Sequence, residues 1–337
     1  MFPPGPLLPT LPTMTETVSD PVIDWLLASD PSVRWQVMRD LLDAPDDAWL
    51  SERARVATEG WGAELLSHED ADGQWAGGAF FPADLTDEEW HDAGQPWTAT
   101  AWAFTQLREF GLEPDSVPAR RATLLAGENS RWEADGAPFW QGEVEECING
   151  RTVADGCYFG VDMAPLVDRL VGEAQPDGAW NCERINGSTR SSFDTTINVL
   201  EGLLEFERAT GGTPASRSAR RRGEEFLLER HLMRRLSTGE IADPDFLRFS
   251  HPVRWHYDVL RALDHFRAAS LPDSAPPDPR LAEAIDIVRS RRRSDGRWDL
   301  DISWPGRRWL RLDEGVGSPS VWVTLRAMRV LRWWDAG

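Results

Sequence analysis

The motif Asp-Gly-x-Trp occurs three times in this chain, and it constrains the fold more than any other feature of the sequence. The copies end at Trp75, Trp180 and Trp298. Their separations are roughly twice the length of a two-helix repeat, which indicates further repeats between them. Asp-Gly is typical of the turn after a helix, because glycine adopts a positive φ without strain. The Trp that follows is then placed to wedge between neighbouring repeats, so we interpret the motif as architectural.

Apolar residues at helical spacing predict more helices between these motifs. One such stripe contains Ile197, Leu200 and Leu203, and another contains Val259 and Leu263. Helices with similar openings are predicted to begin at residues 97, 155, 193, 255 and 319, with partners at 120–125, 167–174, 223–233 and 281–291 and one further pair at 21–42. No segment alternates with a period of two, so we expect an all-α protein without a sheet.

Charge and composition exclude several classes of function. The formal net charge is −20, which argues against binding to nucleic acid or to an anionic membrane surface. All basic side chains are Arg, and the absence of Lys excludes a lysine Schiff base. No apolar run reaches the roughly 18 residues of a transmembrane segment, and the start does not resemble a signal peptide, so we expect a cytoplasmic protein. Five prolines before Met14 predict a flexible leader at residues 1–20, and Met14 is an alternative start.

The three cysteines, Cys147, Cys157 and Cys182, all fall within one stretch of the chain. An odd number of cysteines does not indicate a disulfide framework. Two interpretations stay open: the thiols form a thiolate site, or they are small buried residues of the core.

The segment Gln175–Trp180 resembles the glutamine–tryptophan repeat of squalene and oxidosqualene cyclases, which also marks the β subunits of protein prenyltransferases. The resemblance covers roughly residues 60–335. It implies an α/α toroid of about five to six helix pairs, with inner helices around a central cavity and one domain over residues 21–337.

The segment Cys147–Tyr158 is similar to the zinc-binding stretch of the prenyltransferase β subunits. The resemblance implies that Asp155 and Cys157 bind zinc at the opening of an inner helix, and that Tyr158 helps to bind a diphosphate. The third ligand of that family is a His at the next inner helix, where this chain has Asp194. A further departure is Val161, which stands where the family has Trp.

The acid motif of the cyclases is incomplete. Cyclases of this kind protonate their substrate with Asp-x-Asp-Asp, and the matching run here keeps only Asp194, with Phe193 at the proton-donating position. The ionising motif Asp-Asp-x-x-Asp is absent as well. Both absences disfavour ordinary terpene cyclisation.

Functional residues are expected where inner helices begin, since free N–H groups and the helix dipole favour anionic groups there. The predicted zinc ligands are Asp155, Cys157, Asp194 and Cys182. Asp194, Tyr158 and His256 are the candidate catalytic residues, and His256 is a further candidate ligand. Trp97, Trp102, Phe193 and Trp255 are the predicted cavity-lining residues. Alternatively, the two Asp residues only cap helices, His256 is a hydrogen-bonded rim residue, and the aromatic residues are core.

Three hypotheses about function follow. The leading one is a zinc-dependent enzyme of the prenyltransferase or terpenoid-cyclase type that acts on an isoprenoid or another hydrophobic small molecule. The alternative is a non-catalytic toroid that binds a lipid or a protein partner, with a structural zinc or no metal. The third is a scaffold whose cysteines belong to the core.

Overall fold

The computed structural model describes residues 20–337, and within them the only regular elements are helices and isolated β-bridges. The expected all-α class is therefore confirmed for this part of the chain. The predicted leader lies outside it, apart from Asp20, whose side chain caps the first helix. None of the helices in this range is long and apolar enough to cross a membrane.

The α-helices are α1 (Pro21–Leu27), α2 (Pro31–Asp40), α3 (Asp46–Ala54), α4 (Gly60–Ser67), α5 (Asp87–Ala93), α6 (Thr100–Phe110), α7 (Val117–Asn129), α8 (Glu146–Tyr158), α9 (Ala164–Gly172), α10 (Phe193–Thr210), α11 (Pro214–Leu228), α12 (Val259–Ser270), α13 (Ala282–Ser290) and α14 (Val321–Ala336). The predicted openings at residues 97, 193, 255 and 319 lie at or just before the starts of α6, α10, α12 and α14, and the predicted partners overlap α7, α9, α11 and α13.

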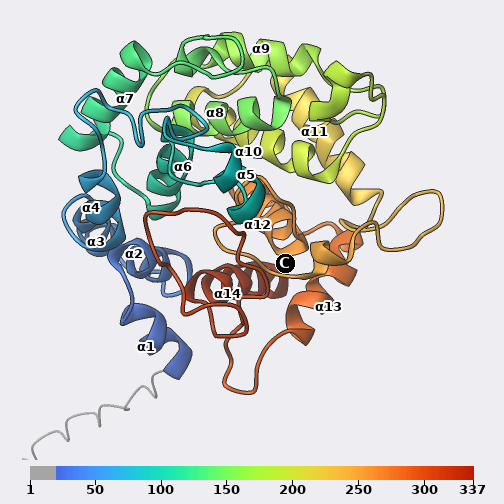
Figure 1. Cartoon of the computed structure of the whole chain (residues 1–337). Helices are drawn as coiled ribbons and strands as arrows, with labels where there is room; N and C mark the ends of the chain where they lie inside the picture. Colours follow the sequence, from blue (N-terminus) through green and yellow to red (C-terminus); the bar gives the residue numbers. More distant parts are fainter. Residues whose placement is uncertain (1–19) are drawn as a thin grey trace, which may run out of the picture.

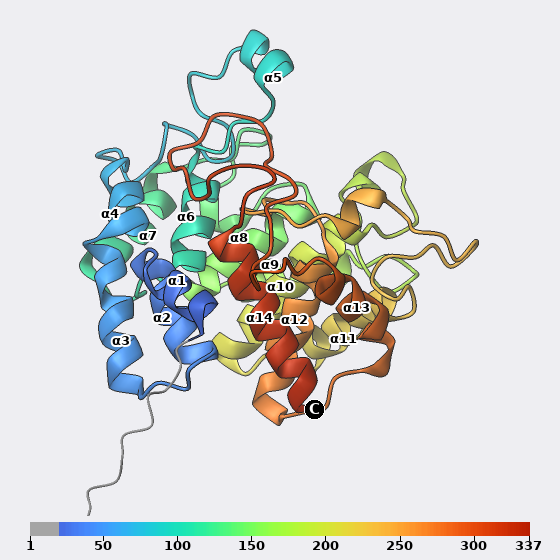
Figure 2. The ribbon, with the colours of Figure 1, turned by 90° about the horizontal axis from the view of Figure 1, so that it is seen from below.

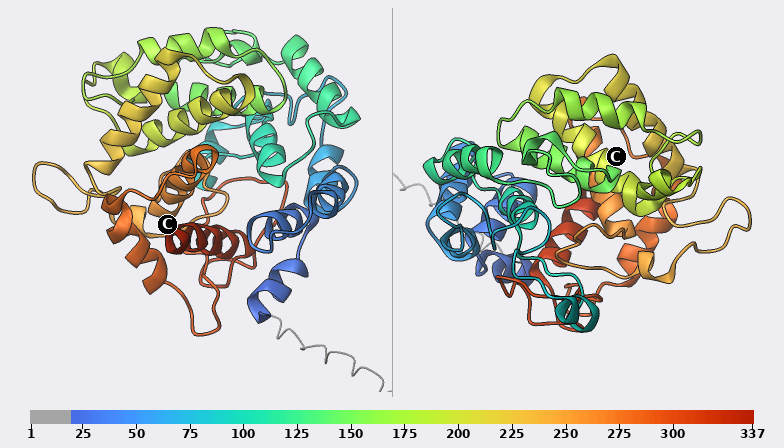
Figure 3. Two further views of the ribbon diagram at one scale, coloured as in Figure 1. Left: turned by 180° about the vertical axis from the view of Figure 1, so that it is seen from behind. Right: turned by 45° about the horizontal axis from the view of Figure 1, so that its top comes forward.

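Helices far apart in the sequence pack in a continuous succession. Helix α6 packs against α8, α8 against α10, α10 against α12, α12 against α14 and α14 against α2, and α2 also contacts α6. Helix α9 covers α8 and α10, while α13 covers α12 and α14. Figure 1 shows α7, α9 and α13 toward the periphery, and Figure 3 shows α14 beside the N-terminal helices from behind.

The Asp-Gly-x-Trp motif closes the C-terminal end of a helix in all three copies. The indole N–H groups of Trp75, Trp180 and Trp298 donate to carbonyl oxygens ten residues earlier, at 2.7–2.8 Å. Each of these carbonyls lies in the last turn of α4, α9 or α13, where backbone acceptors lack partners within the helix. The preceding glycines have φ of +84°, +94° and +86°. The architectural interpretation of the motif is therefore confirmed.

The predicted helix opening at Asp155 is wrong, because α8 begins at Glu146 and Asp155 lies in its last turn. Gly150 lies within this helix, in the region that packs against α10. A Cβ at Gly150 would come within 2.5 Å of the Asn198 carbonyl oxygen, and one at Gly202 within 2.3 Å of the Gly150 carbonyl oxygen. Glycine is thus needed here for the close approach of α8 and α10, and does not end the helix.

The loop between α13 and α14 lies beside the segment that carries α5. Arg307 pairs with Asp84 at 2.8 Å, and its backbone oxygen accepts a hydrogen bond from the Trp97 backbone N–H at 2.7 Å. Figure 2 shows α5 projecting from the molecule, with this loop next to its base. These contacts join the two loops just before the start of α6, next to the candidate site.

Candidate functional site

A cavity with aromatic walls lies at the starts of α6 and α8. Its volume is about 460 Å³, within the usual range for small-molecule sites. The aromatic side chains in its wall are Phe80, Phe81, Trp90, Trp102 and Trp255. Trp102 and Trp255, which the sequence analysis assigned to a cavity, therefore share one wall.

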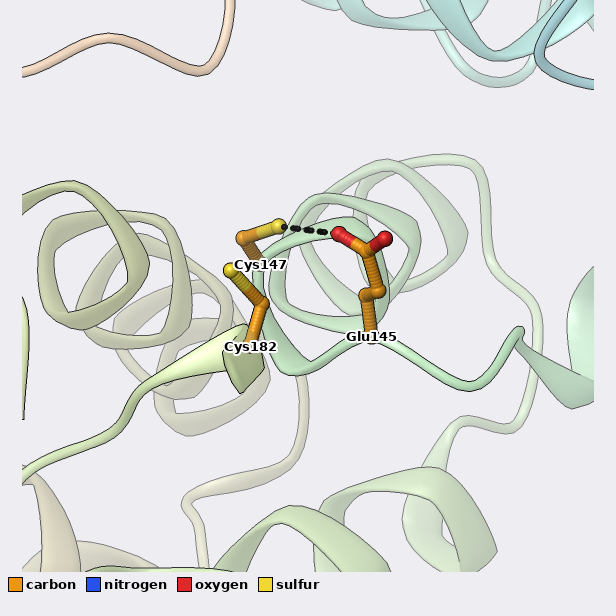
Figure 4. Close-up of side chains that lie close together, drawn as sticks. All are labelled: Glu145, Cys147 and Cys182. Carbon is orange, nitrogen blue, oxygen red and sulfur yellow. Dashed lines mark hydrogen bonds between the residues drawn. The ribbon is translucent and has the colours of Figure 1, made fainter. Parts of the chain in front are cut away.

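A group of two thiols and one carboxylate also lines this cavity. It consists of Glu145, Cys147 and Cys182, whose ligand atoms all lie within 4.8 Å of one another. The Cys147 thiol donates a hydrogen bond to Glu145 Oε2 at 3.4 Å. Figure 4 shows the two sulfur atoms and the carboxylate close together beside the start of α8. None of the three cysteines is in a disulfide.

Backbone hydrogen bonds hold both ends of this group in place. Glu145 precedes the first residue of α8, and its backbone N–H donates to Glu143 Oε2 at 2.6 Å. Cys182 opens a short 3-10 helix, Cys182–Asn186, and its backbone N–H donates to Thr195 Oγ1 at 3.2 Å. Thr195 belongs to the first turn of α10. The group therefore joins the starts of two helices that pack closely on each other.

The two thiols differ in acidity. The neighbouring Cys147 thiol lowers the pKa of Cys182 to about 7, and Thr195 contributes in the same direction against the effect of burial. The proximity of Cys182 in turn raises the pKa of Cys147 well above its usual value, and burial and Glu145 add to this. Near neutral pH the Cys182 thiol is thus partly ionised, whereas Cys147 stays protonated.

These donors fit a zinc ion. Thiolate sulfur and carboxylate oxygen are both common zinc ligands, and three protein ligands leave a fourth position open. Ligand atoms in a tetrahedral zinc site lie about 3.3 to 3.8 Å apart, so a spacing below 4.8 Å needs only small side-chain movements. Because the group lines the cavity, the open position would face a bound molecule.

The structure brings Cys182 into this group, but none of the other predicted zinc ligands. The Asp155 carboxylate is buried and accepts hydrogen bonds from Thr105 Oγ1 and Arg108 Nε, both at 2.7 Å. Cys157 is 7% exposed, and burial raises its pKa to about 12, which keeps it a neutral thiol. In residues 20–337 no second group of three ligand atoms meets the same spacing.

Asp194 lies in the first turn of α10, as expected from the sequence, but its carboxylate is hydrogen-bonded to the backbone and does not face the cavity. Its Oδ1 accepts a hydrogen bond from the Tyr257 backbone N–H at 2.8 Å. Phe193 next to it packs against Phe246 and Tyr257, with ring centroids 4.9 and 5.2 Å away. Neither residue lines the aromatic cavity.

The other candidate catalytic side chains also point elsewhere. The Tyr158 hydroxyl donates to the Leu112 carbonyl at 2.9 Å and accepts from Arg53 at 2.9 Å, and burial raises its pKa. The His256 ring is stacked between Trp255 and Trp304, with centroids 3.6 and 3.3 Å away. Burial, followed by the charge of Arg261, lowers the pKa of His256 to about 3, so it is neutral at physiological pH.

One buried cation contacts the aromatic cavity. The Arg151 guanidinium lies over Trp102, 4.9 Å from the ring centroid, and donates to the Arg254 carbonyl and to Asn198 Oδ1. Burial, and next the charge of Arg261, lowers the pKa of Arg151 to about 10, so it remains charged near neutral pH. The cavity therefore combines apolar walls with a positive charge and a thiol whose pKa is lowered.

Sequence reasoning missed Glu145 and Cys147 as ligands. The clustering of the three cysteines was the signal that pointed to them, together with an acidic residue two positions before the first cysteine. The resemblance of the later Asp-Gly-Cys-Tyr segment led instead to Cys157. Trp97 lies behind the wall rather than in it, packed against Trp102 at 4.7 Å.

No protein-family model matches the chain, and no curated protein matches it either. Among solved structures, it is similar to a crystal structure of a protein from Actinoplanes, with 16% sequence identity and a TM-score of 0.42. That match covers 91% of this chain and 90% of the other.

Proposed function

We propose that this protein binds an isoprenoid or similar hydrophobic molecule in its aromatic cavity, next to a zinc ion held by Glu145, Cys147 and Cys182. The observation that carries the proposal is the position of this group in the wall of the cavity. The three free cysteines also support a reducing, cytoplasmic location.

The fold proposed with this function is an α/α toroid of the prenyltransferase and squalene-cyclase kind. The return of the helix succession from α14 through α2 to α6 supports a closed arrangement. The motif at Trp180, with its Gln, Gly and Trp in register, supports the relationship.

The residues of the cavity have separable roles in this proposal. The faces of Trp102 and Trp255 provide apolar contact and favour a cationic centre in the ligand. Arg151 attracts an anionic group of the ligand. Zinc would supply a Lewis acid and keep a coordinated thiol ionised. Glu145, Cys147 and Cys182 would hold the metal and leave one coordination position facing the ligand.

A non-catalytic binding protein is the second candidate, and one observation favours it. Asp194, Tyr158 and His256 all lie outside the lining of the aromatic cavity, and each is held by hydrogen bonds or stacking. A proton donor for cyclisation is therefore missing from the predicted positions. Binding without turnover uses the same cavity and the same metal.

Tryptophan fluorescence with farnesol and farnesyl diphosphate tests the binding proposal. Trp90 lines the cavity and is 41% exposed, so Trp90→Ser should preserve the fold while removing apolar contact. We expect about tenfold weaker binding of both probes, since such a loss of contact costs on the order of 1.4 kcal/mol. Trp333→Ser, on α14 away from the cavity, is the control and should bind like the unchanged protein.

The outcome of the same experiment separates the two candidates. Conversion of farnesyl diphosphate to a new product, detected by mass spectrometry, would support the enzyme. Binding without conversion would support the binding protein. Absence of binding to the unchanged protein, or equal loss in Trp90→Ser and Trp333→Ser, would contradict the proposed cavity function.

A further inference from the structure

A second cavity lies in the loops before α12 and between α13 and α14. Its volume is about 420 Å³, and its lining includes His251, Arg254, Arg308, Trp309 and Asp313. It is separate from the aromatic cavity, with which it shares no lining residue. Its residues have no part in the function proposed above.

The side chain of Arg254 is buried in this cavity without a polar partner. Arg254 is 5% exposed, and its guanidinium lies over Trp97, 5.0 Å from the ring centroid. Within residues 20–337, no carboxylate lies within ion-pair distance of it, and no acceptor receives a hydrogen bond from it. Among the carboxylates, Glu109 raises the pKa of Arg254 most, but it lies beyond ion-pair distance of the guanidinium.

A buried charge without a partner is unusual, because its desolvation is not compensated. Burial lowers the pKa of Arg254 to about 9, with Glu109 opposing this and Arg151 and Arg308 adding to it. The guanidinium is thus still charged near neutral pH. A carboxylate or phosphate group would supply the missing acceptor, since a guanidinium binds either of them through two parallel hydrogen bonds.

Two other groups of the cavity complement such an anion. His251 is 3% exposed, stacks on Trp322 at 4.7 Å, and neither of its ring nitrogens has a hydrogen-bond partner. Burial lowers its pKa well below the usual value, so the neutral ring offers one N–H donor and one acceptor. Arg308 is exposed, donates to Ser303 Oγ at 3.0 Å, and adds a second positive charge to the lining.

The acidic groups of the lining cancel only part of this positive charge. Glu314 is exposed and pairs with Arg311 at 3.2 Å. Burial raises the pKa of Asp313 to about 6, against opposing effects of Ser320 and Val321. Asp313 therefore keeps a negative charge at neutral pH, which favours a ligand that carries hydrogen-bond donors as well as an anionic group.

We propose that this second cavity binds a small organic anion, whose carboxylate or phosphate group contacts Arg254 with support from Arg308 and His251. The inference does not rest on the zinc site or on the aromatic cavity. It assigns a function to a buried cation that the fold itself leaves unpaired.

Thermal unfolding in a chloride-matched buffer tests the proposal, with sodium phosphate and sodium acetate as probes at equal ionic strength. A saturating oxyanion should raise the Tm of the unchanged protein by about 2 °C or more, because it binds only the folded state. A shift with phosphate alone identifies a phosphate site, and a shift with acetate alone identifies a carboxylate site. Sodium chloride should give no shift.

Three variants make the test specific. Arg254→Met should abolish the shift while leaving the Tm without oxyanion equal or higher, since it removes an unpaired buried charge. Arg308→Gln is exposed and should fold normally, with a reduced shift. Arg222→Gln is the matched control, because Arg222 is also exposed and donates to a serine Oγ, that of Ser218 at 2.9 Å.

Two results would overturn the proposal. One is the absence of any shift with phosphate or acetate in the unchanged protein. The other is an equal shift in the unchanged protein, Arg308→Gln and Arg222→Gln, which would locate the oxyanion elsewhere even if Arg254→Met does not fold.

Discussion

Most buried arginines in residues 20–337 form ion pairs with carboxylates. Asp264 is an example in which one carboxylate pairs with two arginines. Asp264 Oδ1 accepts from Arg329 Nε at 2.9 Å and from Arg267 Nε at 2.8 Å. All three side chains are less than one-fifth exposed. Burial alone would raise the pKa of Asp264, but the two arginines outweigh it and lower the pKa below its usual value. Arg151 is held instead by an amide and a carbonyl oxygen, and Arg254 stands out because its guanidinium has neither kind of partner in this range.

Replacing Asp264 tests this arrangement. Asp264→Asn should destabilise the protein by about 3 kcal/mol at pH 7, because Arg267 loses its ion pair and Arg329 keeps only the longer one with Asp40, at 3.4 Å. The pKa of Asp264 in the folded state lies below its value of about 3.9 in the unfolded state. The stability that the Asp264 carboxylate contributes is therefore fully present above a pH of about 3.9, and it is lost as the pH falls through the folded-state pKa. Urea unfolding at pH 7 and at pH 3.5 should therefore show a smaller difference in stability between the unchanged protein and Asp264→Asn at the lower pH.

The control for this prediction is Asp286→Asn on α13. Asp286 lies 3.8 Å from Arg289 and its side chain is 77% exposed, so the change should have almost no effect. A loss of stability in Asp286→Asn as large as that in Asp264→Asn would contradict the argument from burial.

The sequence alone could not decide whether Cys147 or Cys157 is the thiol of α8 that lies next to Cys182. Both lie in α8, ten residues apart, which corresponds to about 15 Å along a helix. They cannot bind one metal ion together. The sequence indicated a thiol site and included Cys182, but only the true start of α8 shows that Cys147, at the end near Cys182, is the partner.

Among the structural elements, the Asp-Gly-x-Trp turn is the one that the sequence predicted best. Its local chemistry is sufficient, because glycine allows the positive φ and Trp supplies both apolar area and an N–H donor. The helix opening at Asp155 was predicted wrongly because it rested on the resemblance of the Asp-Gly-Cys-Tyr segment to the prenyltransferase stretch. The role of Gly150 within α8 is set by the contact between α8 and α10, which a single sequence does not reveal.

A single substitution in this turn tests the role of the indole N–H. Trp180→Phe keeps the ring but removes the hydrogen bond to the Leu170 carbonyl, 2.7 Å long and fully buried. We expect a loss of about 1 kcal/mol in unfolding free energy, measured by denaturant titration, since the Leu170 carbonyl keeps only the longer hydrogen bond from the Glu173 backbone N–H, at 3.3 Å. Trp333→Phe, which is partly exposed on α14, should stay within about 0.5 kcal/mol of the unchanged protein. Equal stability of Trp180→Phe and the unchanged protein would contradict this role.

At the scale of the whole molecule, the C-terminal helix α14 is hydrogen-bonded to the N-terminal helix α2. Arg329 on α14 donates to Gln36 Oε1 on α2 at 2.9 Å, and Arg332 donates to the Asp40 carbonyl at 2.8 Å. The sequence predicted helix pairs from local patterns, and the proposed toroid came from resemblance. The closing contacts join residues nearly 300 positions apart, and no local pattern encodes them.

Two of the cavities in residues 20–337 differ in chemistry and are connected by one pair of packed tryptophans. Trp102 lines the cavity with the thiols, and Trp97, packed on it at 4.7 Å, supports Arg254 of the second cavity. We therefore make two independent proposals: a hydrophobic ligand binds near the metal in one cavity, and an organic anion binds to Arg254 in the other. Either proposal can be disproved without affecting the other.

The central claim is the metal site, and metal content measured by plasma mass spectrometry tests it most directly. The unchanged protein and Cys157→Ala should each contain about one zinc per chain, whereas Cys147→Ser and Cys182→Ser should lose most of it. Circular dichroism of the four proteins controls for folding. Absence of zinc from the unchanged protein, or its loss from Cys157→Ala with retention in Cys182→Ser, would contradict the account.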